Sequence, residues 1–121
     1  MTDQERIQGN WAMISMEIKG VKRPDDAVKQ YLLKVDGSKW VVLMGEQKVM
    51  NSVFKLDASK EPKTIDLLTL VGKAEVASEG IYKIEGDTLT VCRTDGYKDR
   101  PKEFRADQDA GILVVWKRVT N

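Results

Sequence analysis

The chain of 121 residues contains no histidine and only one cysteine, Cys92. Histidine is the usual general base near neutral pH and the commonest metal ligand. Its absence argues against Ser-His-Asp and Cys-His catalysis and against a metal or haem site. A single cysteine allows no internal disulfide and is too few for a structural zinc site. The sequence therefore predicts a protein without a metal, a cofactor or enzymatic activity.

Net charge and long apolar runs are also lacking. The 20 lysine and arginine residues nearly balance the 19 aspartate and glutamate residues, leaving a formal net charge of +1. No overall field therefore attracts nucleic acid or an anionic membrane. No apolar run approaches the roughly 20 residues of a membrane-spanning helix, and residues 1–6 lack the apolar centre of a signal peptide. We expect a cytoplasmic protein with no membrane span, although a secreted protein after removal of its signal peptide would show the same pattern.

The composition does not shift along the chain, which predicts a single domain spanning residues 1–121. Alternating apolar and polar residues, bounded by turn signals such as Asp36-Gly37 and Glu85-Gly86-Asp87, predict strands. The predicted strands cover residues 11–18, 31–35, 39–44, 48–56, 64–70, 76–84, 88–93 and 112–119. Short helical turns are predicted near residues 3–8 and 25–30, the second beginning after Pro24.

Eight strands joined mainly by short turns predict an all-β fold, an antiparallel up-and-down barrel. Closure of the sheet removes the two edge strands that an open sheet exposes. An open sandwich is the structural alternative.

Two short segments near opposite ends of the chain predict how the barrel closes. Gly9-Asn10-Trp11 begins the first strand, and Trp116-Lys117-Arg118 lies on the last one. Glycine permits a sharp bend or a close approach, and a guanidinium group can lie on an indole face. We interpret Gly9, Trp11 and Arg118 as structural residues that join the two strands, with Trp11 filling one end of the barrel.

The Gly-x-Trp segment and five further blocks carry a resemblance to a known family. The blocks are Ile7-Gln8-Gly9-Asn10-Trp11, Pro62-Lys63-Thr64-Ile65-Asp66-Leu67, Gly80-Ile81-Tyr82, Gly86-Asp87-Thr88-Leu89-Thr90-Val91-Cys92, Arg100-Pro101-Lys102-Glu103-Phe104 and Lys117-Arg118. In this order the chain resembles a bacterial lipocalin-like (calycin) domain family, found largely in planctomycetes and of unassigned function. The resemblance implies a calycin-type barrel and no known activity. The Arg-x-Tyr pair with which intracellular fatty-acid binders hold a carboxylate is missing, because Val119 and Thr120 follow Arg118.

Aromatic and methionine side chains supply material for the wall of an apolar pocket. Trp40, Tyr31, Tyr82 and Phe54 fall on predicted strands, and the chain has five methionines. Such side chains suit a concave apolar site with a few polar groups that orient the ligand. Candidate polar contacts are Ser15, Glu17, Asn51 and Arg93. The sequence thus predicts noncovalent binding of a small, largely apolar ligand; alternatively, the side chains fill the barrel completely.

For the predicted strand 11–18, the sequence does not decide which side chains face the inside of the barrel. Ala12, Ile14, Met16 and Ile18 are all apolar, but Trp11 lies on the opposite parity with Ser15 and Glu17. Since Trp11 must face inward, either Ser15 and Glu17 also face the cavity or a bulge changes the phase. An outward apolar stripe would favour a filled barrel that binds a protein or a second copy of itself. Both a monomer and a homodimer are compatible with the sequence.

Three further features have a reactive and a structural interpretation. Glu17 could act as an acid of raised pKa if desolvated, and Arg93 could activate Cys92; we favour a glutamate at the barrel rim and a small buried cysteine. The segment 97–105 mixes basic residues with Tyr97 and Phe104, but its acidic residues dilute the positive charge. We expect a solvated loop anchored by Phe104 and no nucleic-acid site.

Overall fold

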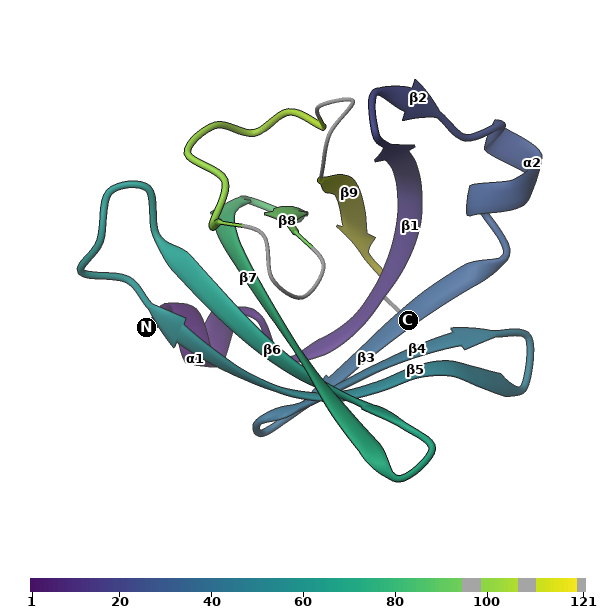
Figure 1. Cartoon of the computed structure of the whole chain (residues 1–121), viewed down its shortest axis with the longest axis horizontal. Coiled ribbons are helices and arrows are strands. Elements are labelled where there is room, and N and C mark those ends of the chain that lie inside the picture. The colour runs from purple at the N-terminus through teal and green to yellow at the C-terminus, as the bar shows by residue number, and fades with distance from the viewer. Residues whose placement is uncertain (95–98, 107–110, 120–121) are drawn as a thin grey trace.

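The structure, a computed structural model, describes residues 1–94, 99–106 and 111–119 (Figure 1). Two short helices and nine strands lie within these ranges. They are α1 (Asp3–Arg6), β1 (Gly9–Ile18), β2 (Val21–Lys22), α2 (Asp25–Val28), β3 (Tyr31–Asp36), β4 (Lys39–Met44), β5 (Gln47–Asp57), β6 (Thr64–Val71), β7 (Ala74–Glu85), β8 (Thr88–Arg93) and β9 (Ile112–Arg118).

The long strands form a closed antiparallel barrel. Neighbours follow the order β1-β3-β4-β5-β6-β7-β8-β9, and β9 pairs with β1 to complete the ring. The predicted eight-stranded barrel is therefore confirmed, and the open sandwich is excluded. The two-residue strand β2 was not predicted from the sequence. It pairs with the end of β1, Glu17 with Lys22 and Ile18 with Val21. Such a short strand shows no alternation from which it could be recognised.

A bulge in β1 resolves the direction of its side chains. The pairing with β9 runs from Met13 with Trp116 directly to Ser15 with Val115, so that Ile14 is the extra residue. Trp11 and Met13 are buried before the bulge, whereas Ile14 is 46% exposed. After it, Met16 and Ile18 contact the barrel interior. The interpretation that Ser15 and Glu17 face inward with Trp11 is wrong, and no continuous apolar stripe faces outward on β1.

Trp11 fills the end of the barrel next to α1. Its side chain is fully buried, and its Nε1 donates a hydrogen bond to the Ile7 carbonyl at 2.9 Å. The Arg118 guanidinium lies over the indole ring at 4.2 Å from the centroid and donates to the Gln8 and Arg6 carbonyls. At Gly9 the φ angle is +117°, and a Cβ atom would lie 3.3 Å from the guanidinium. The backbone conformation thus favours glycine at this position, and a Cβ atom would also crowd the guanidinium group.

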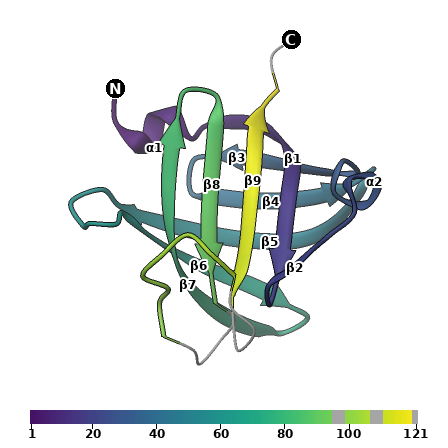
Figure 2. The same ribbon diagram turned by 90° about the horizontal axis from the view of Figure 1, so that it is seen from above.

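Helix α1 covers the same end of the barrel, as Figure 2 shows from above. A capping box between Thr2 and Glu5 starts the helix. The Asp3 carboxylate accepts hydrogen bonds from Lys63 Nζ and from the Tyr82 hydroxyl, both at 2.9 Å. These bonds tie α1 to the barrel, so this end is closed.

The contact between Asp3 and Tyr82 makes stability depend on pH. Burial acts to raise the pKa of Asp3, but hydrogen bonds from Lys63 and Tyr82 outweigh it and hold the pKa below its ordinary value. Burial and the Asp3 carboxylate raise the pKa of Tyr82 far above its ordinary value. The Asp3 contribution is present above the unfolded pKa of about 4 and is lost as the pH falls through the native pKa. The Tyr82 contribution is present below the unfolded pKa of about 10 and is lost as the pH rises above it.

We therefore expect the free energy of unfolding to fall above about pH 10, with Tyr82 contributing up to about 1.4 kcal/mol per pH unit. Urea denaturation at several pH values would measure the slope. The variant Tyr82→Phe should show a shallower alkaline decline than the wild type. Equal slopes in the two proteins would mean that Tyr82 ionises normally in the native state.

Candidate functional site

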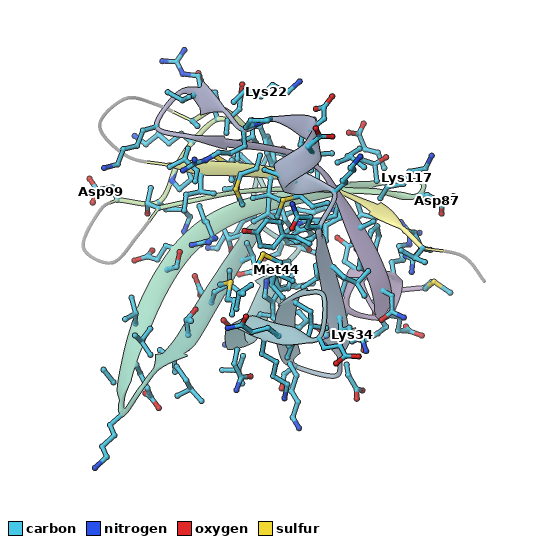
Figure 3. The ribbon with its side chains drawn as sticks, turned by 90° about the vertical axis from the view of Figure 1, so that its right-hand side faces the viewer. Lys22, Lys34, Met44, Asp87, Asp99 and Lys117 are labelled. Atoms are coloured by element: carbon cyan, nitrogen blue, oxygen red, sulfur yellow. The ribbon has the colours of Figure 1, made fainter. Side chains whose placement is uncertain are left out.

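A cavity of about 470 Å³ opens at the end of the barrel opposite α1. Its lining residues are Met13, Met16, Ile18, Tyr31, Trp40, Val42, Val49, Met50, Thr69, Val71, Val76, Ser78, Val91, Arg93, Ile112, Val114 and Trp116. Val49, Val71 and Val76 are between 41% and 58% exposed, which marks them as the rim of the mouth. Figure 3 views the molecule from the side of α2, with Met44 of β4 near the centre and with Asp87 and Lys117 away to one side.

The wall of the cavity follows from strand alternation. Every second residue of β4 and β9 points inward, which brings Trp40 and Val42 together with Ile112, Val114 and Trp116. Trp40 is held by Phe54 behind it, whose ring meets the indole edge to face at 5.7 Å between centroids and 66° between planes. The aromatic part of the wall is therefore fixed by packing.

Polar groups lie on one side of the cavity, on the neighbouring strands β6, β7 and β8. Thr69 shares a hydrogen bond of 2.8 Å with the Ser52 hydroxyl. The Ser78 hydroxyl donates to the Thr94 carbonyl. Arg93 Nη1 lies 3.5 Å from the Ser78 oxygen, at the far limit of a hydrogen bond. The opposite side, formed by β1, β3 and β4, presents apolar and aromatic side chains.

Three of the predicted ligand contacts, Tyr31, Trp40 and Arg93, lie in the wall of this cavity. Phe54 and Tyr82 are buried in the core outside the wall. Phe54 packs behind Trp40, and Tyr82 bonds to Asp3 near the closed end. Strand parity shows that both point inward, but not how far along the barrel they lie.

Ser15, Glu17 and Asn51 face away from the cavity, so the structure does not bring them together with the other predicted ligand contacts. The β1 bulge puts Ser15 and Glu17 outside by shifting the phase after Met13. Asn51 is exposed because its neighbours Met50 and Ser52 point inward. The alternation of side chains along a strand already excludes Asn51 from the cavity wall. Phe54 on the same strand is buried, and the odd spacing between the two residues places their side chains on opposite faces of the sheet.

Several residues of the cavity wall were not predicted from the sequence. Three of the five methionines line the cavity, but nothing in the sequence separates them from Met1 and Met44, which are exposed. Trp116 could have been found from its spacing to Arg118, because both share one parity of the last strand. Ser78 likewise shares the inward parity of Tyr82. Short polar residues such as Ser78 are easily taken for surface residues when alternation is read from hydropathy alone.

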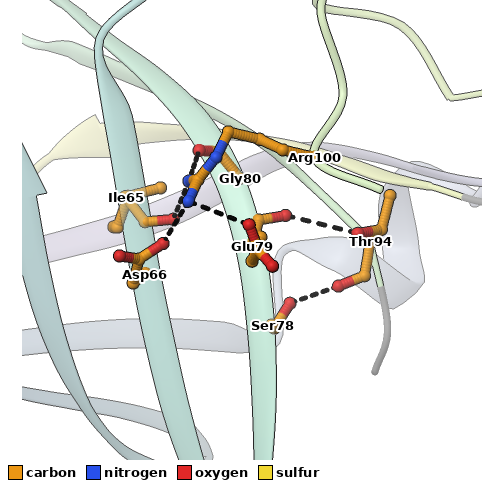
Figure 4. Close-up of polar contacts among 7 residues, drawn as sticks. All are labelled: Ile65, Asp66, Ser78, Glu79, Gly80, Thr94 and Arg100. Carbon is orange, nitrogen blue, oxygen red and sulfur yellow. Dashed lines mark hydrogen bonds and ion pairs between the residues drawn. The ribbon is translucent and has the colours of Figure 1, made fainter. Parts of the chain in front are cut away.

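A segment outside the barrel, residues 99–106, packs over β7 and β8; we call it the strap. Arg100 attaches it through Nη1 to the Gly80 carbonyl at 2.7 Å and the Ile65 carbonyl at 3.2 Å (Figure 4). Its Nη2 donates to Asp66 at 2.6 Å and to Glu79 at 3.0 Å. The strap therefore spans β6 and β7 through one guanidinium group.

The strap also covers Cys92, which is completely buried and donates from Sγ to the Arg105 carbonyl at 3.3 Å. Lys83 lies 5.0 Å from the centre of the Phe104 ring. Phe104 thus contacts the barrel as expected, but Arg100 supplies more bonds. Tyr97, the other aromatic of the predicted loop, lies outside the described residues.

Within the described ranges, no group of three or more acidic or cysteine side chains is placed to hold a metal ion. None of the helices in that part of the chain is long and apolar enough to cross a membrane.

Comparisons with known proteins return no match: no family model fits the chain, and neither a curated protein nor a solved structure is similar to it. Three features of the cavity bear on the function of the protein: its volume, its apolar wall and its polar side.

Proposed function

We propose that the barrel binds a small, largely apolar ligand noncovalently in the cavity at its open end. The observation that carries the proposal is a volume of about 470 Å³ with a predominantly apolar wall. Small-ligand pockets typically measure about 300 to 1,000 Å³ and combine apolar walls with a few polar groups. Burial of apolar ligand surface would supply the affinity, at about 25 cal/mol per Å². Such binding requires no covalent step.

The make-up of the wall supports a ligand of variable shape. Met13, Met16 and Met50 come from two strands and have flexible, polarizable side chains that fit irregular surfaces. Trp40 and Trp116 add flat surfaces. This combination of adaptable and fixed groups suits a class of related ligands better than one rigid molecule.

We also propose that the protein is a lipocalin-like barrel. Support comes from the pairing of β1 with β9 and from the stacking of Arg118 on Trp11 of the Gly-x-Trp segment. In such a barrel the closed end provides stability and the open end admits the ligand. This division agrees with the positions of α1 and of the cavity mouth.

The alternative of a filled barrel that serves as an interaction module has less support. The barrel contains a cavity, and the β1 bulge divides the apolar stripe from Ala12 to Ile18 between the two faces of the sheet. Only Ile14 among these apolar residues is largely exposed.

Titration with the neutral apolar dye N-phenyl-1-naphthylamine tests the proposal by dye emission and calorimetry. We expect saturable binding of one dye per chain. Met50→Trp should weaken it about tenfold or more, because a larger side chain occupies the cavity. Asn51→Trp adds the same indole to the outer face of β5 and should change the affinity less than about twofold; tenfold corresponds to about 1.4 kcal/mol.

Two results would contradict the proposal. One is a wild-type protein that binds neither this dye nor a series of neutral apolar compounds of similar size. The other is an equal loss of affinity in Met50→Trp and Asn51→Trp, which would place the dye outside the cavity.

A further inference from the structure

The outer face of β5, β6 and β7 carries exposed apolar side chains that lie next to one another. Val53 pairs with Leu68, and Leu68 pairs with the exposed Ala77, so the three side chains form a row across the strands. Leu70 follows Leu68 on the same face of β6. Val53, Leu68 and Leu70 are between 36% and 52% exposed, and Figure 3 shows the hairpin of β6 and β7 extending beyond the rest of the barrel. We call these residues the apolar patch; contiguous surface of this kind is typical of a protein contact.

Charged side chains of opposite sign lie on the two flanks of the apolar patch. Lys39 pairs with Val53 on the side of β4. Glu75 pairs with Leu70 on the side of β7. The exposed charges of the basic flank, on β4 and β5, and of the acidic flank, on β7, are Lys39, Lys48 and Lys55 and, opposite them, Glu75 and Glu79.

We infer that the apolar patch is the contact between two copies of this chain, which form a symmetric dimer by packing face to face. A two-fold axis parallel to β6 brings β5 of one copy over β7 of the other. The basic flank of each copy then faces the acidic flank of the second copy, at two places related by the symmetry. Two sheets commonly pack in this way with nearly aligned strands. The inference goes beyond the proposed function and does not depend on it.

The sizes of the side chains suit this arrangement. Leu68 lies on the middle strand, so it meets Leu68 of the second copy near the axis. Val53 of one copy lies over Ala77 of the other, which places a larger side chain over a smaller one. The outer face is hollowed at these residues, all of which line the depression. The patch is therefore complementary to itself in shape as well as in charge.

The carboxylates nearest the axis are compatible with the dimer. Asp66 of β6 would face its own copy, but it accepts a hydrogen bond of 2.6 Å from Arg100, whose charge offsets the repulsion. Lys55 and Glu79 both pair with Asp66, from opposite sides, so the two-fold axis brings Lys55 of one copy to Glu79 of the other. The side chain of Glu79 is 51% exposed beside Arg100 and is accessible to that lysine.

A partner with charge of one sign fits this surface less well. A nucleic acid or an anionic membrane would meet the acidic flank, and a basic protein would meet the basic flank. A second copy carries both signs in the order that the two flanks require. This charge complementarity is the reason for which we assign the patch to self-association.

Sedimentation equilibrium at chain concentrations up to about 0.5 mM tests the inference, and we expect a monomer–dimer equilibrium in the wild type. Leu68→Glu should raise the dimer dissociation constant at least about tenfold, because it places like charges opposite each other at the axis. Ile14→Glu is the matched control: it introduces the same glutamate at an apolar residue of β1 that is 46% exposed and lies outside the patch. It should change the dissociation constant less than about twofold.

A charge swap tests the orientation of the two copies without altering an apolar residue. Lys48→Glu and Glu75→Lys should each raise the dissociation constant about five- to tenfold, because each opposes like charges at both symmetric places. The double variant exchanges the two signs and should return to within about threefold of the wild type. Both positions are exposed, so these variants do not depend on the folding of Leu68→Glu.

Three results would contradict the inference. One is a wild type that sediments only as a monomer up to about 0.5 mM. The second is an equal effect of Leu68→Glu and Ile14→Glu, which would place the contact elsewhere. The third is a double variant as weak as the single ones, which would exclude the two-fold arrangement. Dye binding by Leu68→Glu should stay within about twofold of the wild type, so failure of the dimer leaves the proposed function standing.

Discussion

Replacing Trp11 with alanine is expected to lower the free energy of unfolding by about 3 to 5 kcal/mol. The indole is fully buried at the closed end, so its removal leaves a cavity there. The substitution also removes the donor to the Ile7 carbonyl and the ring beneath the Arg118 guanidinium. Urea denaturation of the wild type and the variant would measure the difference. A loss below about 1 kcal/mol would show that Trp11 does not hold the closed end together.

Trp11→Phe is the control that separates packing from hydrogen bonding. Phenylalanine retains most of the apolar volume and an aromatic face for Arg118, but it cannot donate to Ile7. We expect a loss of about 1 to 3 kcal/mol, the cost of a buried carbonyl without its partner and of a smaller ring. If both variants lose equally, the hydrogen bond and not the volume accounts for the stability.

Replacing Arg100 with alanine is expected to loosen the strap and to raise the rate at which Cys92 reacts with a thiol reagent by about 10- to 100-fold. The thiol is completely buried, so it reacts only when the covering segment opens. Arg100 donates to two backbone carbonyls and two carboxylates. Because the ion pairs are partly exposed, we expect their loss to cost about 1.4 to 2.7 kcal/mol of local stability, which corresponds to the stated range of rates.

Lys102→Ala provides the matched control for the strap. Lys102 belongs to the same segment and is exposed. Its removal should leave the rate of Cys92 modification within about twofold of the wild type, well below the tenfold that about 1.4 kcal/mol would produce. Identical rates for the wild type and Arg100→Ala would show that the strap is held by other contacts, such as the one between Phe104 and Lys83.

The fold could be predicted from the sequence because it follows from local patterns. Alternating residues identified the eight long strands, and glycine-containing turns separated most of them. Pairing of Gly9-Asn10-Trp11 with the last strand then indicated closure. The bulge at Ile14 could not be predicted, since an apolar residue at every position from Trp11 to Ile14 fits either phase. Only the register with β9 decides it.

The sequence predicted the type of site, an apolar pocket in a barrel, but only some of the residues that line it. Parity separates inward from outward side chains and, applied consistently, would have rejected Asn51 and included Trp116. It does not give the height of a residue along the barrel. Tyr82 and Arg93 both point inward from adjacent strands, yet Tyr82 reaches α1 and Arg93 reaches the open cavity. Cys92 is buried by the strap, and no periodic pattern in the sequence predicts where that segment packs.

The pairing of β1 with β9 also has a consequence for how the chain reaches its native state. All other long strands pair with a neighbour close in sequence, whereas Arg118 donates to the carbonyl of Gln8, 110 residues away. Contacts at such separation form slowly, because loop closure must precede them. Until β9 pairs with β1, the sheet is an open ribbon with unpaired edges at β1 and β9, and such edges promote aggregation. The yield of refolding should therefore be governed by this one junction more than by the stability of the finished barrel.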